Sequence, residues 1–224
     1  MPKEADVPSG RLYEPANLLS LFRIAVIPFI GYYLWRGDRH NAIICAALLA
    51  AAGLTDLLDG WVARRMNQVS RLGLVLDPVA DKTLALSLVV MLVFFRDLPL
   101  WLAGSIVGRD ILILSGGIAL VRNKRVVLSS NLTGKYTFVA IVFLLVSYVL
   151  RFEYGIRLMM PLVVALIVLS TILYARTFVL VTKGNAAPEF ADRSAYRLLR
   201  VAASTVIAVL YFVRLYVFLF EDLL

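Results

Sequence analysis

The sequence has almost none of the residues that build disulfide frameworks or thiolate and imidazole metal sites. It contains one cysteine, Cys45, and one histidine, His40, in 224 residues. A lone cysteine inside an apolar segment excludes both a disulfide framework and a cysteine-ligated metal centre, and it is best interpreted as a small core residue. His40 lies in a short loop outside the apolar segments, and we assign it no role.

Charged residues are also scarce. They make up 17% of the chain, whereas hydrophobic residues make up 61% and the mean hydropathy is +0.85. These values exclude an ordinary soluble domain and indicate an integral membrane protein. The net charge of +8 does not indicate a nucleic-acid partner, because the cations lie at the ends of apolar segments without an aromatic–basic module. Anionic lipid headgroups fit this distribution better.

Apolar segments long enough to cross a bilayer recur along the chain. We predict an all-α polytopic membrane helix bundle with six core helices and a seventh, C-terminal helix, at residues 17–35, 41–64, 73–95, 100–121, 132–150, 158–182 and 201–220. No removable signal peptide is expected, since the first apolar segment is of full length. We expect a membrane domain over 1–183, then a linker and C-terminal hydrophobic helix over 184–224, which either crosses the membrane, as we favour, or lies along its surface.

Lys and Arg in the short loops predict the orientation of the chain. With the N-terminus in the cytoplasm, the other side of the membrane receives few cations, which are Arg36, Arg39, Arg96, Arg151 and Arg157. Most of the remaining loop cations then lie on the cytoplasmic side, as the positive-inside rule requires. We therefore expect a protein of the cytoplasmic membrane whose acidic segment, described next, faces the cytoplasm.

Four aspartates stand in the segment TDLLDGWVARRMNQVSRLGLVLDPVADK. Asp56 and Asp59 are three residues apart near the end of one predicted helix, and Asp77 and Asp81 are four apart near the start of the next, so each pair shares a helix face. The short connection makes the two helices antiparallel neighbours and brings both pairs to the same depth. Clustered carboxylates close to lipid repel one another, so they need a cation.

Oxygen ligands without His or Cys favour a hard divalent cation, Mg²⁺ or Mn²⁺, over zinc. Because Mg²⁺ usually binds through a few carboxylates together with phosphate oxygens, we expect a diphosphate substrate. Arg64 follows the first pair of aspartates and can donate to a phosphate or neutralise one carboxylate. Gly60 and Gly73 lack side chains and let a ligand approach the backbone, so the segment predicts a nucleotide cleft.

These positions resemble a known family. The pattern Asp56-x2-Asp59-Gly60-x2-Ala63-Arg64-x8-Gly73-x3-Asp77-x3-Asp81 is similar, without a gap, to the signature of the CDP-alcohol phosphatidyltransferases. The resemblance covers residues 17–182. It implies a six-helix core that forms a homodimer and transfers a phosphatidyl group from CDP-diacylglycerol to an alcohol, with release of CMP.

The resemblance also implies a role for each matching residue. Asp56, Asp59 and Asp77 would bind a pair of metal ions, and Asp81 would complete the metal site and act as the general base. The contacts to the cytidine diphosphate would come from Asp56, Gly60, Ala63, Arg64 and Gly73. Metal ions that bridge the diphosphate would neutralise its charge during direct displacement, so no covalent enzyme intermediate is needed.

The identity of the acceptor alcohol stays open between several alternatives. The segment Asn17–Arg23 and the Asp77-Pro-Val-Ala-Asp81-Lys82 run resemble phosphatidylglycerophosphate synthases, so glycerol 3-phosphate is the favoured acceptor. In contrast, Gly108-Arg109-Asp110 followed by a glycine pair resembles cardiolipin synthases that use CDP-diacylglycerol and phosphatidylglycerol. A phosphatidylinositol phosphate synthase is a further alternative.

Three cations are candidates for binding an acceptor phosphate: Arg109, Lys135 and Arg176. Arg109 could instead pair with a neighbouring carboxylate and hold helices together. Arg23 lies about two turns inside the first predicted helix, where it either contacts the aspartates or extends to the membrane interface.

Two other classes of protein use similar carboxylates. A membrane prenyltransferase also binds metal and diphosphate through paired aspartates, but the Gly-x2-Ala-Arg and Gly-x3-Asp framework favours a CDP donor. A divalent-cation transporter predicts carboxylates near the midplane and inverted repeats. Here the aspartates lie toward one face and the motif has no second copy.

Overall fold

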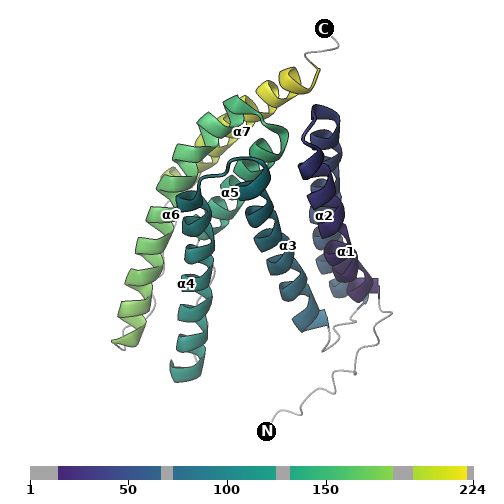
Figure 1. Cartoon of the computed structure of the whole chain (residues 1–224). Coiled ribbons are helices and arrows are strands. Elements are labelled where there is room, and N and C mark those ends of the chain that lie inside the picture. Colours follow the sequence, from purple (N-terminus) through teal and green to yellow (C-terminus); the bar gives the residue numbers. More distant parts are fainter. Residues whose placement is uncertain (1–14, 67–72, 125–131, 184–193, 221–224) are drawn as a thin grey trace. The chain divides into compact units, whose positions relative to one another are not determined.

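The computed structural model describes residues 15–66, 73–124, 132–183 and 194–220, with side chains for 20–55, 79–118, 132–183 and 200–220. Within these residues the chain is all helical and has no strand (Figure 1), which confirms the predicted fold class. The helices are α1 (Pro15–Arg36), α2 (Arg39–Met66), α3 (Gly73–Phe95), α4 (Leu100–Lys124), α5 (Leu132–Leu150), α6 (Glu153–Thr182) and α7 (Ser194–Phe220).

Some helices extend beyond the predicted apolar segments into polar residues. α6 begins at Glu153, where the Ile156 N–H donates to the Phe152 carbonyl at 3.0 Å. Glu153 and Arg157 lie one turn apart, with Nε and Oε2 3.8 Å from each other. Hydropathy marks only the apolar part of a helix, so this first turn of α6 lay outside the predicted segment.

The chain divides into two compact units, residues 1–98 and 99–224. In the first unit, α1 packs against both α2 and α3. The packing of α1 on α3 is close, because a Cβ atom at Gly31 would lie 3.1 Å from Met91 Cε. Cys45 is fully buried in this unit, as expected for a core residue. The predicted boundary between residues 183 and 184 does not coincide with this division, and it remains a prediction.

Asp38 caps the start of α2. Its carboxylate accepts a hydrogen bond from the Asn41 N–H at 3.4 Å and another from the Asn41 side chain. An acidic side chain at this position satisfies N–H groups that have no partner within the helix. The hydrogen bond from the Asn41 side chain holds the pKa of Asp38 below its ordinary value.

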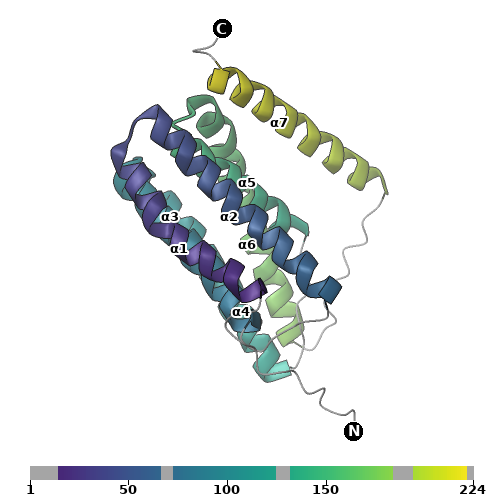
Figure 2. The same cartoon turned by 90° about the vertical axis from the view of Figure 1, so that its right-hand side faces the viewer.

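In the second unit, α6 packs against α4, α5 and α7. α5 and α6 are joined by a short turn and run antiparallel (Figure 2), and the Thr137 hydroxyl of α5 donates to the Leu166 carbonyl of α6 at 3.3 Å. Near the turn, a methyl group at Gly155 would overlap the Phe152 ring and the Ser147 hydroxyl. This glycine lets the start of α6 approach the end of α5.

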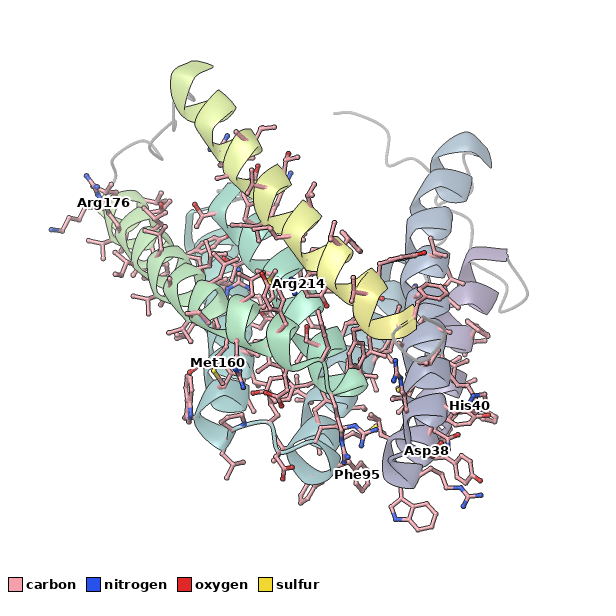
Figure 3. The ribbon with its side chains drawn as sticks, turned by 90° about the horizontal axis from the view of Figure 1, so that it is seen from above. Asp38, His40, Phe95, Met160, Arg176 and Arg214 are labelled. Atoms are coloured by element: carbon pink, nitrogen blue, oxygen red, sulfur yellow. The ribbon has the colours of Figure 1, made fainter. Side chains whose placement is uncertain are left out.

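Within the second unit, α7 is attached to α5 through Tyr211, which is fully buried. The Tyr211 hydroxyl lies 2.9 Å from Ser147 Oγ and donates to the Phe143 carbonyl at 3.1 Å. Farther along the helix, the Arg214 guanidinium, labelled in Figure 3, lies 5.1 Å from the centre of the Tyr154 ring. Most other described side chains of α7 are apolar and exposed.

Four helical segments in the described part of the chain are long and apolar enough to cross a membrane: Leu100–Ile118, Leu132–Leu150, Glu153–Thr182 and Arg200–Phe220. The segment Arg39–Thr55 is a shorter apolar helix. Length and composition therefore identify an integral membrane protein, and the C-terminal helix is among the segments that qualify.

Candidate active site

The four aspartates of the sequence motif lie on two helices, as predicted. Asp56 and Asp59 belong to α2, and Asp77 and Asp81 belong to α3. The other motif positions are also helical: Gly60, Ala63 and Arg64 on α2 and Gly73 at the start of α3. Among all of these residues, only Asp81 lies within the part of the chain whose side chains are described.

Asp81 forms an ion pair with Arg23. Arg23 Nη1 lies 2.8 Å from Asp81 Oδ1, and the pair links α1 to α3. The Arg23 side chain is 1% exposed, whereas that of Asp81 is 45% exposed. Arg23 Nη2 also donates to Ser20 Oγ at 3.1 Å, and Ser20 is fully buried. Of the two alternatives for Arg23, the structure shows contact with an aspartate of the motif.

The environment of Asp81 suits a residue that works on a ligand. A cation held within an apolar helix offsets one of the four negative charges and holds one carboxylate oxygen in place. The partial exposure of Asp81 leaves its carboxylate accessible from outside the helix packing. Sequence reasoning could find Arg23 because an arginine inside an apolar helix needs a partner, but it could not identify that partner.

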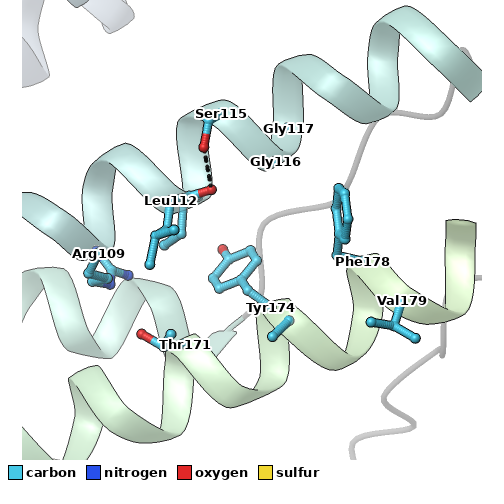
Figure 4. A pocket seen from close by; sticks show the side chains of 11 residues that line it. Arg109, Leu112, Ser115, Gly116, Gly117, Thr171, Tyr174, Phe178 and Val179 are labelled. Carbon is cyan, nitrogen blue, oxygen red and sulfur yellow. Dashed lines mark hydrogen bonds between the residues drawn. The ribbon is translucent and has the colours of Figure 1, made fainter.

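A pocket of about 480 Å³ lies between α4 and α6 in the second unit, with Arg109 at one end (Figure 4). Its walls are largely apolar, and three hydroxyl groups are interspersed among them. The Ser115 hydroxyl is already used, since it donates to the Leu112 carbonyl at 3.2 Å. The lining residues are Arg109, Leu112, Ile113, Ser115, Gly116, Gly117, Thr171, Tyr174, Ala175, Phe178 and Val179.

Arg109 is buried and joins three helices. Its Nη1 lies 2.8 Å from Asp110 Oδ1, its Nε donates to Ser170 Oγ on α6 at 3.3 Å, and its Nη2 donates to the Gly134 carbonyl on α5 at 3.4 Å. The predicted pairing with a neighbouring carboxylate is therefore present. Arg109 also lines the pocket, so it holds helices together at a place where a ligand can reach it.

Of the three cations predicted for the acceptor, Arg109 alone lines the pocket. Lys135 and Arg176 are exposed, and neither lines the pocket. Arg176, labelled in Figure 3, projects from the end of α6 away from the neighbouring helices. Tyr174 and Phe178 lie four residues apart on the α6 face that lines the pocket, and residue 176 falls between them on another face. Acceptor binding by Lys135 and Arg176 remains a prediction.

Comparison with known proteins agrees with the motif on α2 and α3. Residues 14–174 match the profile of the family described as CDP-alcohol phosphatidyltransferase. The chain belongs to this family. The matched region includes all four aspartates, Arg23 and Arg109, and ends within α6 at the level of the pocket.

Individual relatives of this phosphatidyltransferase fall into two groups. It is 42% identical over 100 residues to the cardiolipin synthase (CMP-forming) of Rattus norvegicus, covering 44% of this chain and 32% of the relative. With the corresponding Streptomyces coelicolor protein the identity is 36% over 115 residues, covering 50% and 54%. The CDP-diacylglycerol–glycerol-3-phosphate 3-phosphatidyltransferase of Aquifex aeolicus is 33% identical over 160 residues, covering 70% and 87%.

The extent of these matches differs between the two groups. The chain spans about a third of the rat protein and about half of the Streptomyces protein. It spans most of the Aquifex protein. Identity is therefore higher toward the cardiolipin synthases, whereas coverage is longer toward the glycerol-3-phosphate enzyme.

Proposed function

We propose that this phosphatidyltransferase transfers the phosphatidyl group of CDP-diacylglycerol to phosphatidylglycerol, which forms cardiolipin and CMP. The observation that carries the choice of acceptor is the Arg109–Asp110 ion pair at 2.8 Å beside a largely apolar pocket. These two side chains together contribute no net charge. Such a place suits the single negative charge of a lipid phosphodiester better than a phosphate monoester, which carries nearly two charges at neutral pH.

A second candidate acceptor is glycerol 3-phosphate, which the motifs in α1 and α3 favoured. The long match to the Aquifex protein supports it. The higher identity to the cardiolipin synthases supports phosphatidylglycerol. Asp110 would lie close to the phosphate of either acceptor, and its repulsion would be stronger for the doubly charged glycerol 3-phosphate.

For the donor side, we propose that two divalent cations, Mg²⁺ or Mn²⁺, bind to the oxygen ligands of Asp56, Asp59, Asp77 and Asp81. A set of metal ligands that consists only of carboxylates, on two consecutive helices, fits hard cations of this kind. When bound, the ions would neutralise the diphosphate and stabilise the departing CMP. The cytidine diphosphate would be contacted by Asp56, Gly60, Ala63, Arg64 and Gly73.

The reaction between the acceptor and CDP-diacylglycerol is then one direct displacement. The acceptor hydroxyl oxygen attacks the phosphorus that carries diacylglycerol, and the bond from this phosphorus to the bridging oxygen breaks. CMP leaves with that oxygen and its electron pair. Asp81 accepts the proton of the hydroxyl, as a general base within hydrogen-bond reach would. Arg23 holds one oxygen of Asp81 and so orients its carboxylate.

We also propose that the site faces the cytoplasm and that the enzyme is a homodimer. The loop distribution of Lys and Arg supports the orientation. The family resemblance supports the dimer. In this arrangement, CDP-diacylglycerol and the acceptor reach the site from the cytoplasmic half of the bilayer.

The test is CMP release by the purified protein with CDP-diacylglycerol and Mg²⁺, with phosphatidylglycerol, glycerol 3-phosphate or inositol phosphate as the acceptor. We expect release with phosphatidylglycerol and a lipid product that contains two phosphates. Release with glycerol 3-phosphate alone would replace the proposal by phosphatidylglycerophosphate synthesis. Absence of release with every acceptor would contradict both.

A further inference from the structure

The contacts along α7 show that this helix runs beside α5 in the same direction. Near the start of both helices, the Arg200 guanidinium lies 5.7 Å from the centre of the Tyr136 ring. Near the end of α5, the Tyr211 hydroxyl lies 2.9 Å from Ser147 Oγ. α7 therefore follows most of the length of α5, which supports the expectation that it crosses the membrane.

Farther along α7, Arg214 carries a positive charge to the turn between α5 and α6. Its guanidinium lies 5.1 Å from the centre of the Tyr154 ring, in the first turn of α6 (Figure 3). Arg214 is exposed, and no carboxylate in the described part of the chain pairs with it. The nearby Glu153 already lies 3.8 Å from Arg157. Stacking on a tyrosine ring holds the guanidinium in place, but it does not neutralise the charge.

The positive-inside rule does not account for Arg214. In the orientation proposed above, the α5–α6 turn lies on the side of the membrane away from the cytoplasm, where short loops are poor in cations. Three arginines nevertheless belong to this end of the second unit: Arg151 in the turn, Arg157 near the start of α6, and Arg214 on α7. A cation that an apolar helix carries at this level indicates a binding function.

The surface of α7 next to Arg214 is apolar on the side toward the middle of the membrane. Leu210 and Val206 lie about one and two turns before Arg214 on the same face of the helix, and they are 46% and 57% exposed. Because α7 runs from the cytoplasmic side in the proposed orientation, both residues lie deeper in the membrane than Arg214. The surface therefore changes from cationic to apolar in the direction in which a lipid of the outer leaflet extends from its phosphate to its acyl chains.

We propose that Arg214 and Tyr154, with Arg157 one turn farther along α6, bind the phosphodiester of an anionic phospholipid in the leaflet away from the cytoplasm. One acyl chain of this lipid lies along Leu210 and Val206. The planar guanidinium can donate two hydrogen bonds to phosphate oxygens, and a tyrosine suits the polar edge of a membrane. This site is separate from the aspartate motif and does not depend on the identity of the acceptor. Only the choice of leaflet depends on the proposed orientation.

The test compares the labelling of the purified protein by two lipids in phosphatidylcholine nanodiscs. Phosphatidylglycerol and phosphatidylcholine, each with a photoreactive group near the glycerol end of one acyl chain, would be added separately, and the labelled peptides would be identified. We expect phosphatidylglycerol to label peptides from 151–161 or 203–214 about fivefold more than phosphatidylcholine, since one cation near an anionic lipid contributes about 1 kcal/mol. Arg214→Gln should remove most of this preference, and Arg214→Lys, which keeps the charge, should retain part of it.

Arg36→Gln is the matched control. Arg36 is also an exposed arginine over a tyrosine ring, 5.6 Å from the centre of Tyr32, but its Nε donates to the hydroxyl of that tyrosine at 3.2 Å. This variant should leave the preference at 151–161 and 203–214 unchanged.

A further variant, Glu221→Gln with Asp222→Asn, tests whether the carboxylates that follow α7 in the sequence neutralise Arg214. We expect the preference for phosphatidylglycerol to persist without them. A preference that appears only in this variant, equal labelling of the wild type by both lipids, or an undiminished preference in Arg214→Gln would overturn the lipid site. CMP release, in contrast, tests only the proposed function.

Discussion

Arg23 and Asp81 show how the protein keeps a charge inside an apolar helix. The guanidinium is almost completely buried, and it contacts both a carboxylate of α3 and the buried Ser20 hydroxyl. Removing a guanidinium from water without a partner costs several kcal/mol. The two side chains therefore act as one unit, and a change at Asp81 leaves the buried Arg23 guanidinium without its ionised partner.

Arg23→Gln should lower both stability and activity. Loss of a hydrogen bond to a charged group costs about 1–3 kcal/mol, and the Asp81 carboxylate also loses its orientation. The measurement is thermal unfolding in detergent together with CMP release, with the exposed Arg36→Gln on α1 as the control. In the double variant with Asp81→Asn, the loss of stability should be smaller than the sum of the losses in the two single variants. Strict additivity would show that the pair contributes no coupling.

Asp81→Asn should reduce CMP release by at least about 100-fold, because an amide cannot accept the proton of the acceptor hydroxyl. The variant should lose some stability, because Arg23 loses its ionised partner, but it should still fold, since the amide nearly preserves the shape of the side chain. Asp97→Asn is the control, because Asp97 has φ +56 in the turn after α3, where Asn is also tolerated. Turnover close to that of the wild type in Asp81→Asn would rule out the base assignment.

At the scale of elements, the helices follow the hydrophobic pattern, and their close approach depends on small residues. The connection between α5 and α6 has Arg151 at φ +53, and the Phe152 N–H donates to the Ser147 carbonyl at 2.9 Å. Gly155 then passes directly beside Phe152 and Ser147. The apolar pattern predicts two helices here, but it does not show how closely their ends pack.

Gly155→Ala should destabilise the protein by about 1–3 kcal/mol, because the added methyl group forces Phe152 or the helix itself to move. Thermal unfolding of the purified variant measures the effect. Gly104→Ala is the matched control, since nothing lies within 4 Å of its Cβ position, and it should be neutral or stabilising by up to about 1 kcal/mol. Equal stability of the two variants would contradict the close packing at Gly155.

At the scale of the whole molecule, the aspartate motif and the α4–α6 pocket belong to different compact units. The aspartates lie on α2 and α3 in residues 1–98, and the pocket lies on α4 and α6 in residues 99–224. The family profile extends across both units. The proposed reaction therefore depends on the whole matched region, and neither unit contains all of the proposed groups.

Removal of divalent cations should abolish CMP release. Without the ions, the four aspartates would repel the negative charge of the diphosphate. Activity would be measured in EDTA, after addition of excess Mg²⁺ or Mn²⁺, and with matched NaCl as the control for ionic strength. Restoration by the divalent ions alone is expected. Full activity in EDTA would contradict the metal assignment.

The sequence by itself determined the membrane character, the seven helices and the aspartate motif of the family. These features depend on composition, on apolar segments and on the spacing of nearby residues, all of which act over short distances along the chain. Only the tertiary structure decided which partner Arg23 has, that Arg109 lines a pocket, and that Arg176 lies outside it. Such contacts join helices that are far apart in the sequence, as with Arg109 and Ser170, which are 61 residues apart. They arise from side-chain packing, which no local pattern specifies.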